Sequence, residues 1–265
     1  MSSLPAQVIV EVKDRIQSAG WISLFLDFDG TLVPIAADPR EPQLGSETAR
    51  ALKLISSRES LATTVISGRA VEDLYGRIRL EGLIYAGNHG LEIFGRDLRF
   101  VEPFAWSRRK QLEKLADDLG TQLQTVPGAF VEYKGLTASV HYRRAVRADV
   151  PGIRAAVHSA AARHGPLFRV NAGSEVLEIV PCTNWHKGAA AHWINSQLRP
   201  RPALSIYVGD DTTDEDAFRV LSDAITIKVG AAGVTWARYR LPHPAAVREF
   251  LLWLAARGTP RAGGV

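Results

Sequence analysis

Cysteine is almost absent from this chain, since Cys182 is the only one among 265 residues. A single thiol cannot form an intrachain disulfide, and it cannot supply the several thiolates of a zinc–sulfur site. A lone cysteine outside such sites usually behaves as a small apolar side chain, so we expect Cys182 to be buried. The sequence thus excludes a disulfide scaffold and a thiolate zinc protein.

Long apolar runs and a strong charge of one sign are also missing. No stretch approaches the roughly 18–20 apolar residues of a membrane span. No basic stretch followed by a long apolar run, the pattern of a signal peptide, is found near the N-terminus. We therefore expect a cytoplasmic protein without a membrane partner. The balance of 32 Lys and Arg against 28 Asp and Glu leaves a net charge of +4, and without a long basic run nucleic-acid binding is not indicated.

What the chain does contain is the composition of an ordinary soluble protein, with 46% hydrophobic and 23% charged residues. Short apolar runs of strand length alternate with helical patterns. The runs cover residues 21–26, 61–66, 204–208 and 224–229, and the helical patterns cover residues 47–57 and a segment that begins near His186. Nearly continuous apolarity is typical of parallel strands that are covered on both faces. The alternation predicts an α/β fold with a doubly wound, Rossmann-like parallel-sheet core.

The middle of the chain has a different pattern. Amphipathic helical stretches alternate with pairs of strand-like stretches, in the order helix, strand, strand, helix, strand, strand. The helices are expected at residues 106–119 and 149–163, and the strands at 129–134, 137–143, 167–171 and 176–180. We therefore expect an inserted α+β cap domain (αββαββ) at residues 104–183, within a core made of residues 1–103 and 184–265.

Two aspartates follow the first apolar run, in the segment Asp27-Phe28-Asp29-Gly30-Thr31. Ligands of an open parallel sheet collect where its strands end. In the turn beyond the strand the two carboxylates can converge on one centre, with Asp27 as a nucleophile. Gly30 allows the backbone to approach an anion, and Thr31 offers a hydroxyl. Taken alone, the segment is also compatible with a polar turn that has no chemistry.

Polar residues follow the second run and open the helix after the insertion. Ser67 precedes Gly68 and Arg69, and its hydroxyl can bind a phosphate oxygen or cap a helix. Lys187 can neutralise a phosphate and a nearby carboxylate, or it can be an ordinary surface lysine.

An acidic segment follows the third run. It has acids at positions 210, 211, 214, 215 and 216, which together suit a hard cation. Capping of the next helix and its dipole explain Glu215 and Asp216. They explain Asp210 less well, because Asp210 stands at the end of the strand, before the helix.

Taken together, these segments resemble the haloacid dehalogenase-like phosphatases and, within them, the trehalose-phosphatase family. The matching stretches are DFDGTLVPIAADP, VISGR, YAGNHGLE, VEYK followed by HYR, LEIVP, WHKGAA and YVGDDTTDEDAF. They span most of the chain, from residue 24 to about residue 218. The stretches YAGNHG and GDDTTDEDAF are much more specific to the trehalose-phosphatase group than the general signature is.

The resemblance implies a mechanism. Asp27 would attack phosphorus and form an aspartyl-phosphate, while Asp29 would protonate the leaving oxygen and then activate water. Ser67 and Lys187 would stabilise the transferring phosphoryl group. Thr31, Gly68 and Arg69 are further candidates for binding the substrate. Mg²⁺ would be held by the Asp27 carboxylate, the Asp29 backbone carbonyl and Asp210, with Asp214 and Asp211 as supporting residues.

The expected cap sheet has one polar face, which carries Glu132, Lys134, Arg143 and Glu178 by strand alternation. Such mixed charges can hydrogen-bond the hydroxyls of a sugar, and the matching positions of the family contact the sugar. An ordinary solvated sheet face has the same pattern.

Two polar residues of the GNHG turn, Asn88 and His89, would line the core side of the cleft or belong to a glycine turn. The chain departs from the family at Ser174 and Val180, where basic residues are common. The substrate is therefore less closely defined than the chemistry.

The resemblance implies hydrolysis of trehalose 6-phosphate to trehalose and phosphate by a monomer. Three alternatives remain at this point. The first is a phosphatase for another sugar phosphate, of the sucrose or mannosylglycerate type. The second is an inactive sugar-phosphate sensor, which both aspartates of the Asp-x-Asp pair disfavour. The third is a phosphomutase, which fits the cap and the acidic segment less well.

Overall fold

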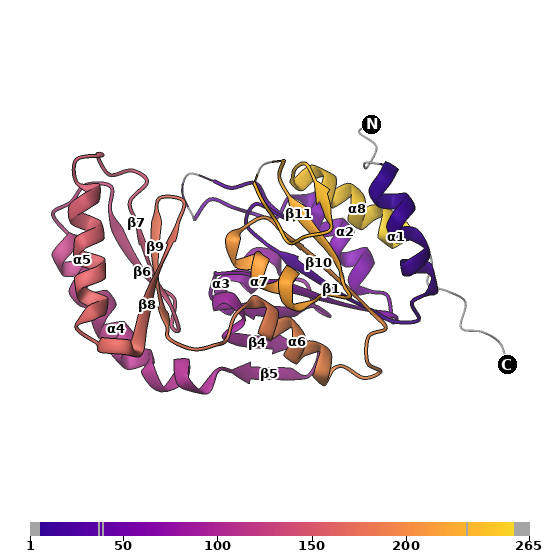
Figure 1. The fold of residues 1–265 in the computed structure, drawn as a ribbon, viewed down its shortest axis with the longest axis horizontal. Coiled ribbons are helices and arrows are strands. Elements are labelled where there is room, and N and C mark those ends of the chain that lie inside the picture. The colour runs from indigo at the N-terminus through magenta and orange to yellow at the C-terminus, as the bar shows by residue number, and fades with distance from the viewer. Residues whose placement is uncertain (1–5, 37, 39, 232, 257–265) are drawn as a thin grey trace. The chain divides into compact units, whose positions relative to one another are not determined.

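The fold was analysed in a computed structural model, which describes residues 6–36, 38, 40–231 and 233–256 (Figure 1). The chain divides into two compact units. The first contains residues 1–100 and 185–265, and the second contains residues 101–184. We expected the inserted domain at residues 104–183, and the second compact unit spans residues 101–184.

The first unit is built on an eight-stranded sheet with the order β12-β11-β10-β1-β2-β3-β4-β5. Neighbouring strands from β12 to β3 are parallel, and β4 pairs with β3 in the antiparallel direction. The strands are β1 (Ile22–Asp27), β2 (Leu61–Ile66), β3 (Ile84–Gly87), β4 (Glu92–Gly95), β5 (Leu98–Val101), β10 (Leu204–Gly209), β11 (Ile225–Val229) and β12 (Tyr239–Leu241).

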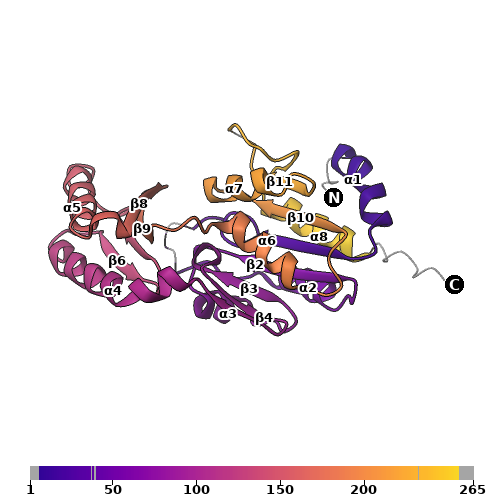
Figure 2. The ribbon, with the colours of Figure 1, turned by 60° about the horizontal axis from the view of Figure 1, so that its bottom comes forward.

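Helices cover both faces of this sheet. Successive side chains of a strand point to opposite faces, so a strand that is apolar throughout presents apolar side chains on both faces. In β1, Leu24 and Leu26 pack in one apolar cluster with helices α1, α2, α3 and α8, while Phe25 packs in another with α6 and α7. Both groups can be followed in Figure 2. The helices are α1 (Ala6–Ser18), α2 (Ser46–Ser56), α3 (Val71–Ile78), α6 (Lys187–Gln197), α7 (Thr212–Val220) and α8 (Pro244–Ala256). The predicted doubly wound α/β core is confirmed.

The position of β1 matters for function. The chain runs from β1 outward through β2 and β3, and after the insertion it returns to β10 on the other side of β1. The order of strands therefore reverses at β1. Such a switch point opens a crevice beyond the carboxyl ends of the strands, and ligands of open α/β sheets bind there.

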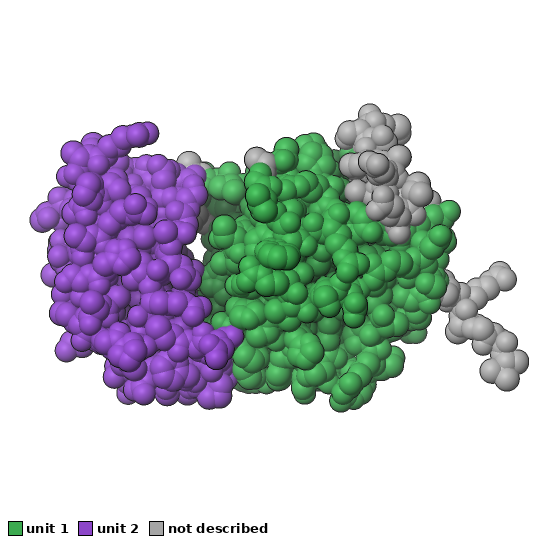
Figure 3. Space-filling view, viewed as in Figure 1, with its two compact units in different colours: residues 1–100, 185–265 green, residues 101–184 purple. Residues whose placement is uncertain are grey.

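The second unit, purple in Figure 3, is a four-stranded antiparallel sheet with the order β6-β7-β9-β8 and two helices. Its elements are α4 (Pro103–Leu123), β6 (Phe130–Tyr133), β7 (Ala138–His141), α5 (Val150–Ala162), β8 (Phe168–Gly173) and β9 (Val176–Pro181). Leu115 of α4 and Val157 of α5 pack with Val140 and Leu177 of the sheet in one cluster. The expected αββαββ order is confirmed.

The expectation of a buried cysteine is wrong, because Cys182 is exposed. It follows Pro181, the last residue of β9, in the segment that leaves the sheet. Its backbone N–H still donates to Leu167, at 2.9 Å, but a side chain beyond the end of a strand is no longer part of the packed apolar face. Among the described residues we find no helix with the length and apolarity of a membrane span.

Candidate active site

Four polar residues end up at one edge of the core sheet, because parallel strands have their carboxyl ends on the same side. Asp27 is the last residue of β1, Ser67 directly follows β2, Asn88 follows β3 and Asp210 follows β10. All four come from strands at or near the switch point. The sequence-predicted segments are thus brought together by the topology of the sheet.

A group of three carboxylates lies at this edge. One oxygen each of Asp27, Asp210 and Asp214 lies within 4.8 Å of the others. Lys187, at the start of α6, joins two of them, since its Nζ donates to Asp27 Oδ1 at 2.7 Å and to Asp214 Oδ1 at 2.8 Å. The side chains of Asp27, Lys187 and Asp214 are only 6%, 2% and 0% exposed. This buried cluster of charges is the centre of the candidate active site.

Burial and mutual repulsion shift the ionisation of these groups. Burial raises the pKa of Asp27 well above its usual range, against the opposing effect of the Lys187 ammonium, and Asp214 and Asp210 raise it further. Burial, followed by the charge of Asp214, raises the pKa of Asp210 to about 6. For Lys187 burial acts to lower the pKa, but Asp214 and Asp27 prevail and raise it well above its usual value. Lys187 is therefore an ammonium among carboxylates.

The loop after β1 is shaped around Asp210. Gly30 has a φ of +83°, and a Cβ on it would lie 2.0 Å from Asp210 Oδ2. The Thr31 hydroxyl, which is fully buried, donates to Asp210 Oδ1 at 3.3 Å. Only a glycine at position 30 lets this carboxylate approach the loop.

The three carboxylates fit a hard divalent cation. Carboxylate oxygens are the ligands that Mg²⁺ prefers. Three carboxyl groups lie around the single ammonium of Lys187, and Asp214 and Asp210 each act to raise the pKa of Asp27. Asp27, Asp210 and Asp214 are the residues that would hold the ion.

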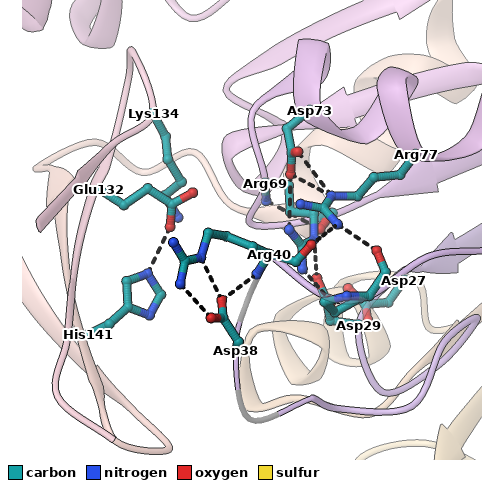
Figure 4. A network of polar contacts seen from close by, with 12 residues as sticks. Asp27, Asp29, Asp38, Arg40, Arg69, Asp73, Arg77, Glu132, Lys134 and His141 are labelled. Atoms are coloured by element: carbon teal, nitrogen blue, oxygen red, sulfur yellow. Dashed lines mark hydrogen bonds and ion pairs between the residues drawn. The ribbon is translucent and has the colours of Figure 1, made fainter. Parts of the chain in front are cut away.

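The second aspartate of the Asp-x-Asp pair does not join this group. The Asp29 carboxylate accepts two hydrogen bonds from Arg69, from Nε at 2.7 Å and from Nη2 at 2.8 Å. Arg69 Nη1 in turn donates to Asp73 of α3 at 2.9 Å. Figure 4 shows this chain of contacts. The Asp27 and Asp29 carboxylates therefore have different partners.

The turn after β2 places Ser67, Gly68 and Arg69 beside the turn after β3. Ser67 is 2% exposed, and its Oγ accepts from the backbone N–H of Arg69 at 3.2 Å. The backbone N–H of His89 donates to the carbonyl of Ser67 at 2.8 Å. A Cβ on Gly68 would lie 2.8 Å from the His89 ring, so glycine leaves room for this imidazole.

Asn88 has a structural partner in the same turn. Its Nδ2 donates to Glu92 Oε1 at 2.7 Å, and the same oxygen accepts from the backbone N–H of Val71 at 2.8 Å. Burial raises the pKa of Glu92, against these two hydrogen bonds. The fully buried Asn88 thus ties the turn to the start of α3.

The acidic side chains of segment 210–216 have different hydrogen-bond partners. Asp211 caps α7 by accepting from the backbone N–H of Thr212 at 2.7 Å, and Asp214 accepts from the backbone N–H of Asp211 at 3.0 Å. Glu215 binds Lys228 at 3.1 Å and the backbone N–H of Trp236 at 2.9 Å. Glu215 therefore anchors a neighbouring loop and also stands in the first turn of α7, where a negative charge favours the helix dipole, as expected.

Sequence reasoning missed Tyr207 of β10. Its fully buried hydroxyl donates to Asp214 Oδ1 at 2.9 Å, the same oxygen that accepts from Lys187. A tyrosine hydroxyl inside an apolar parallel strand needs a polar partner. The need of this hydroxyl for a polar partner was therefore the feature of the sequence that could have identified Tyr207.

The sheet of the second unit carries a polar row across all four strands. Glu132, Ser139, Glu178 and Asn171 are successive partners in the strand register. Asn171 was missed, although alternation along its strand places it on this face. The predicted separation into a polar face and an apolar face, the latter packed on α4 and α5, is seen.

Charged residues on the polar face are paired with each other. Lys134 Nζ lies 2.6 Å from Glu178 Oε1, and their side chains are only 9% and 14% exposed. His141 Nε2 lies 2.7 Å from Glu132 Oε2, as Figure 4 shows.

At the β8–β9 turn, Arg143 Nη2 donates to the carbonyl of Ser174 at 3.1 Å, and its Nε lies 3.2 Å from Glu175. A guanidinium thus lies at Ser174, one of the two positions expected to depart from the family pattern. Val180, the other position that departs from the family, is buried in β9.

The fold, a doubly wound core with an inserted α+β unit, is shared with the crystal structure of a haloacid dehalogenase-like hydrolase from Bacteroides thetaiotaomicron, with a TM-score of 0.60, 14% identity, and coverage of 88% of this chain and 99% of that chain. A family model described as trehalose-phosphatase matches residues 25–239, and the chain belongs to that family.

Individual relatives agree with this assignment. A trehalose-phosphate phosphatase of Mycobacterium bovis is 38% identical over 237 residues, which are 86% of this chain and 60% of that protein. The chain thus matches 60% of the length of this relative, which is less than two thirds. The crystal structure of a trehalose-6-phosphate phosphatase related protein has the same fold, with a TM-score of 0.79, 24% identity, and coverage of 88% of this chain and 97% of that chain. The C-terminal domain of the Candida albicans trehalose-6-phosphate phosphatase has a TM-score of 0.77 and 21% identity, with 96% and 97% covered.

Proposed function

We propose that this protein is a Mg²⁺-dependent phosphatase that hydrolyses trehalose 6-phosphate to trehalose and phosphate. The observation that carries the proposal is the buried group of Asp27, Lys187, Asp214 and Asp210 at the switch point of the sheet, in a chain of the trehalose-phosphatase family. Relatives with that printed activity support the choice of substrate.

Asp27 is the nucleophile in this proposal. Its Oδ1 is held by Lys187 at 2.7 Å, which fixes the carboxylate and balances part of its charge. Attack of a carboxylate oxygen on phosphorus forms an aspartyl-phosphate and expels the sugar alcohol. Lys187, beside this oxygen, and the buried Ser67 at the next strand end stabilise the charge on the transferring phosphoryl group.

Asp29 is the acid and base. It lies two residues beyond the nucleophile and outside the carboxylate group, held by Arg69. In the first step its carboxylic acid protonates the leaving sugar oxygen, and in the second its carboxylate takes a proton from the water that attacks the aspartyl-phosphate. Mg²⁺ at Asp27, Asp210 and Asp214 would supply charge neutralisation for a phosphate oxygen.

The polar face of the second unit's sheet, with Arg143 beside its β8–β9 turn, is the proposed sugar-recognition surface. Glu132, Lys134, Arg143 and Glu178 supply both donors and acceptors, as the hydroxyls of a disaccharide require. Two of them, Lys134 and Glu178, are nearly buried and fixed by their ion pair. A preformed pair loses little freedom when a ligand binds.

The test is phosphate release across a panel of sugar phosphates, measured as kcat/KM with Mg²⁺. The panel contains trehalose 6-phosphate, sucrose 6-phosphate, mannosylglycerate phosphate and glucose 6-phosphate. We expect trehalose 6-phosphate to exceed every other member by at least about 100-fold, the discrimination that several lost hydrogen bonds produce. Equal rates for all members would contradict the proposed substrate, and no phosphate release from any member would contradict the proposed chemistry.

A further inference from the structure

We propose that Asp73, in the first turn of α3, is a positioning residue that acts through Arg69 on the carboxylate of Asp29. The proposal rests on the proposed function, in which Asp29 is the acid and base. Asp73 itself touches neither substrate nor reacting atoms in this proposal. Its effect is to fix the guanidinium that holds Asp29.

The first contact in this chain is the bidentate ion pair between Arg69 and Asp29. Arg69 Nε reaches Asp29 Oδ2 at 2.7 Å and Nη2 reaches Oδ1 at 2.8 Å. Two parallel hydrogen bonds of this kind set the plane of the carboxylate as well as its distance. The orientation of Asp29 therefore depends on where Arg69 holds its guanidinium.

The second link fixes that guanidinium. Arg69 Nη1 donates to Asp73 Oδ2 at 2.9 Å, on the edge that Asp29 does not use. Its Cζ also lies 5.6 Å from the centre of the ring of Phe28, which is fully buried. With Asp29 on one edge and Asp73 on the other, the Arg69 side chain is only 11% exposed.

The third link holds Asp73 in place. Arg77 Nε donates to Asp73 Oδ1 at 3.0 Å and to Oδ2 at 2.9 Å, and its Nη1 donates to the carbonyl of Arg40 at 3.2 Å. Asp73 thus lies between two arginines, as Figure 4 shows. Although burial acts to raise its pKa, the hydrogen bonds and charges of Arg77 and Arg69 lower it, so Asp73 is a carboxylate.

Removal of Asp73 has a defined consequence. Arg69 loses the partner on its second edge, and its long side chain regains rotational freedom. The Asp29 carboxylate then loses its fixed plane. Catalytic groups that are misplaced by about 1 Å lose on the order of 100-fold in rate, and protonation of the leaving group is the step that needs Asp29 as an acid.

A purely structural role makes a different prediction. Asp73 forms i,i+4 ion pairs within and next to α3 and stands in the first turn, where a negative charge stabilises the helix. Loss of that effect alone lowers the stability of the fold and changes the hydrolysis of every phosphate ester by the same factor.

The experiment compares Asp73→Ala with the matched control Glu72→Ala. Glu72 is an exposed acid in the same first turn of α3, so both variants lose one charge near the same helix terminus. For each variant kcat/KM is measured with two esters. One is the sugar phosphate that the wild type cleaves best, whose alcohol must be protonated as it leaves, and the other is p-nitrophenyl phosphate, whose phenolate leaves without a proton.

We expect Asp73→Ala to lower kcat/KM for the sugar phosphate about 10-fold or more, part of the roughly 10²–10⁴-fold that a general acid supplies. The value for p-nitrophenyl phosphate should change by less than about 2-fold, and Glu72→Ala should change neither ester. Asp73→Glu should recover part of the loss.

Equal loss with both esters, or no loss with either, would overturn the role of Asp73. A wild type that cleaves p-nitrophenyl phosphate and a sugar phosphate other than trehalose 6-phosphate would overturn only the proposed substrate, because the comparison needs an alcohol leaving group and no particular sugar. A wild type that cleaves no ester would overturn the proposed function and this role with it.

Discussion

At the scale of single residues, the candidate active site is a balance of buried charges. Three carboxylates, of Asp27, Asp210 and Asp214, surround one ammonium, that of Lys187. A buried charge without a partner is costly, since the interior does not replace the water that it has lost. Lys187 therefore has a structural task besides its proposed catalytic one.

Because the Lys187 ammonium neutralises buried carboxylates, we predict that Lys187→Ala destabilises the fold in the absence of Mg²⁺. The variant leaves Asp27 and Asp214 buried without their ammonium, and removal of one partner from a buried ion pair costs about 3–5 kcal/mol. Urea unfolding in EDTA measures the loss. Added Mg²⁺ should restore more stability to the variant than it gives the wild type.

The matched control is Lys53→Ala, because Lys53 is an exposed lysine in a helix of the same unit. Its loss should change the free energy of unfolding by less than about 0.5 kcal/mol, as is usual for surface positions. Equal effects of the two substitutions would mean that the buried cluster does not depend on Lys187.

Residue by residue, the sequence allowed Asp27, Asp210 and Lys187 to be located at two strand ends and a helix start, because each follows a recognisable strand or opens a helix. It did not show how they pair. That Asp29 binds Arg69 while Asp27 binds Lys187 depends on side-chain directions in the turn after β1. Likewise, the contacts of Tyr207 with Asp214 and of Asp73 with Arg69 form only when the elements pack together.

At the scale of elements, the strands that carry apolar runs were predicted closely. The run at 61–66 coincides with β2, and the hairpin at 129–143 contains β6 and β7. The strands β3, β4, β5 and β12 were missed, and each has only three or four residues. The pair β4 and β5 is mostly half-buried or exposed. The hairpin that joins β4 and β5 has its turn at Arg96 and Asp97, which both have a positive φ. Neither of these two positions carries the asparagine or glycine that usually marks such a turn in a sequence. Short edge strands of this kind give no clear periodicity.

The polar face of the second unit's sheet supplies a prediction at this scale. Glu178→Ala removes the partner of Lys134 at the centre of the polar row. We expect KM for trehalose 6-phosphate to rise about 10-fold, the equivalent of one hydrogen bond to a charged group. Both kcat and the rate with p-nitrophenyl phosphate should stay within about 2-fold of the wild type, because the phosphoryl-transfer residues belong to the other unit.

Glu113→Ala serves as the control for this kinetic comparison, because Glu113 is an exposed glutamate of α4 in the same unit. It should leave KM unchanged. A fall in kcat for Glu178→Ala with both substrates would argue against a role limited to sugar binding.

At the scale of the whole molecule, one chain supplies two units with different chemistry. The first unit is assembled from segments on either side of the second, and its parallel sheet brings residues from positions 27 to 214 to one edge. The second unit offers a polar sheet face with few reactive groups. The proposed function assigns phosphoryl transfer to the first unit and sugar recognition to the second, and the family match extends over both.

The most direct test of this assignment is to trap the phosphorylated enzyme. The wild-type protein is mixed with trehalose 6-phosphate in Mg²⁺ or in EDTA, quenched in acid and digested, and its peptides are analysed by mass spectrometry. We predict a phosphate group on the peptide that contains Asp27 in Mg²⁺, at least about 100-fold less of it in EDTA, and none in Asp27→Asn, which should also release no phosphate. Phosphate release by Asp27→Asn at a substantial fraction of the wild-type rate would contradict Asp27 as the nucleophile.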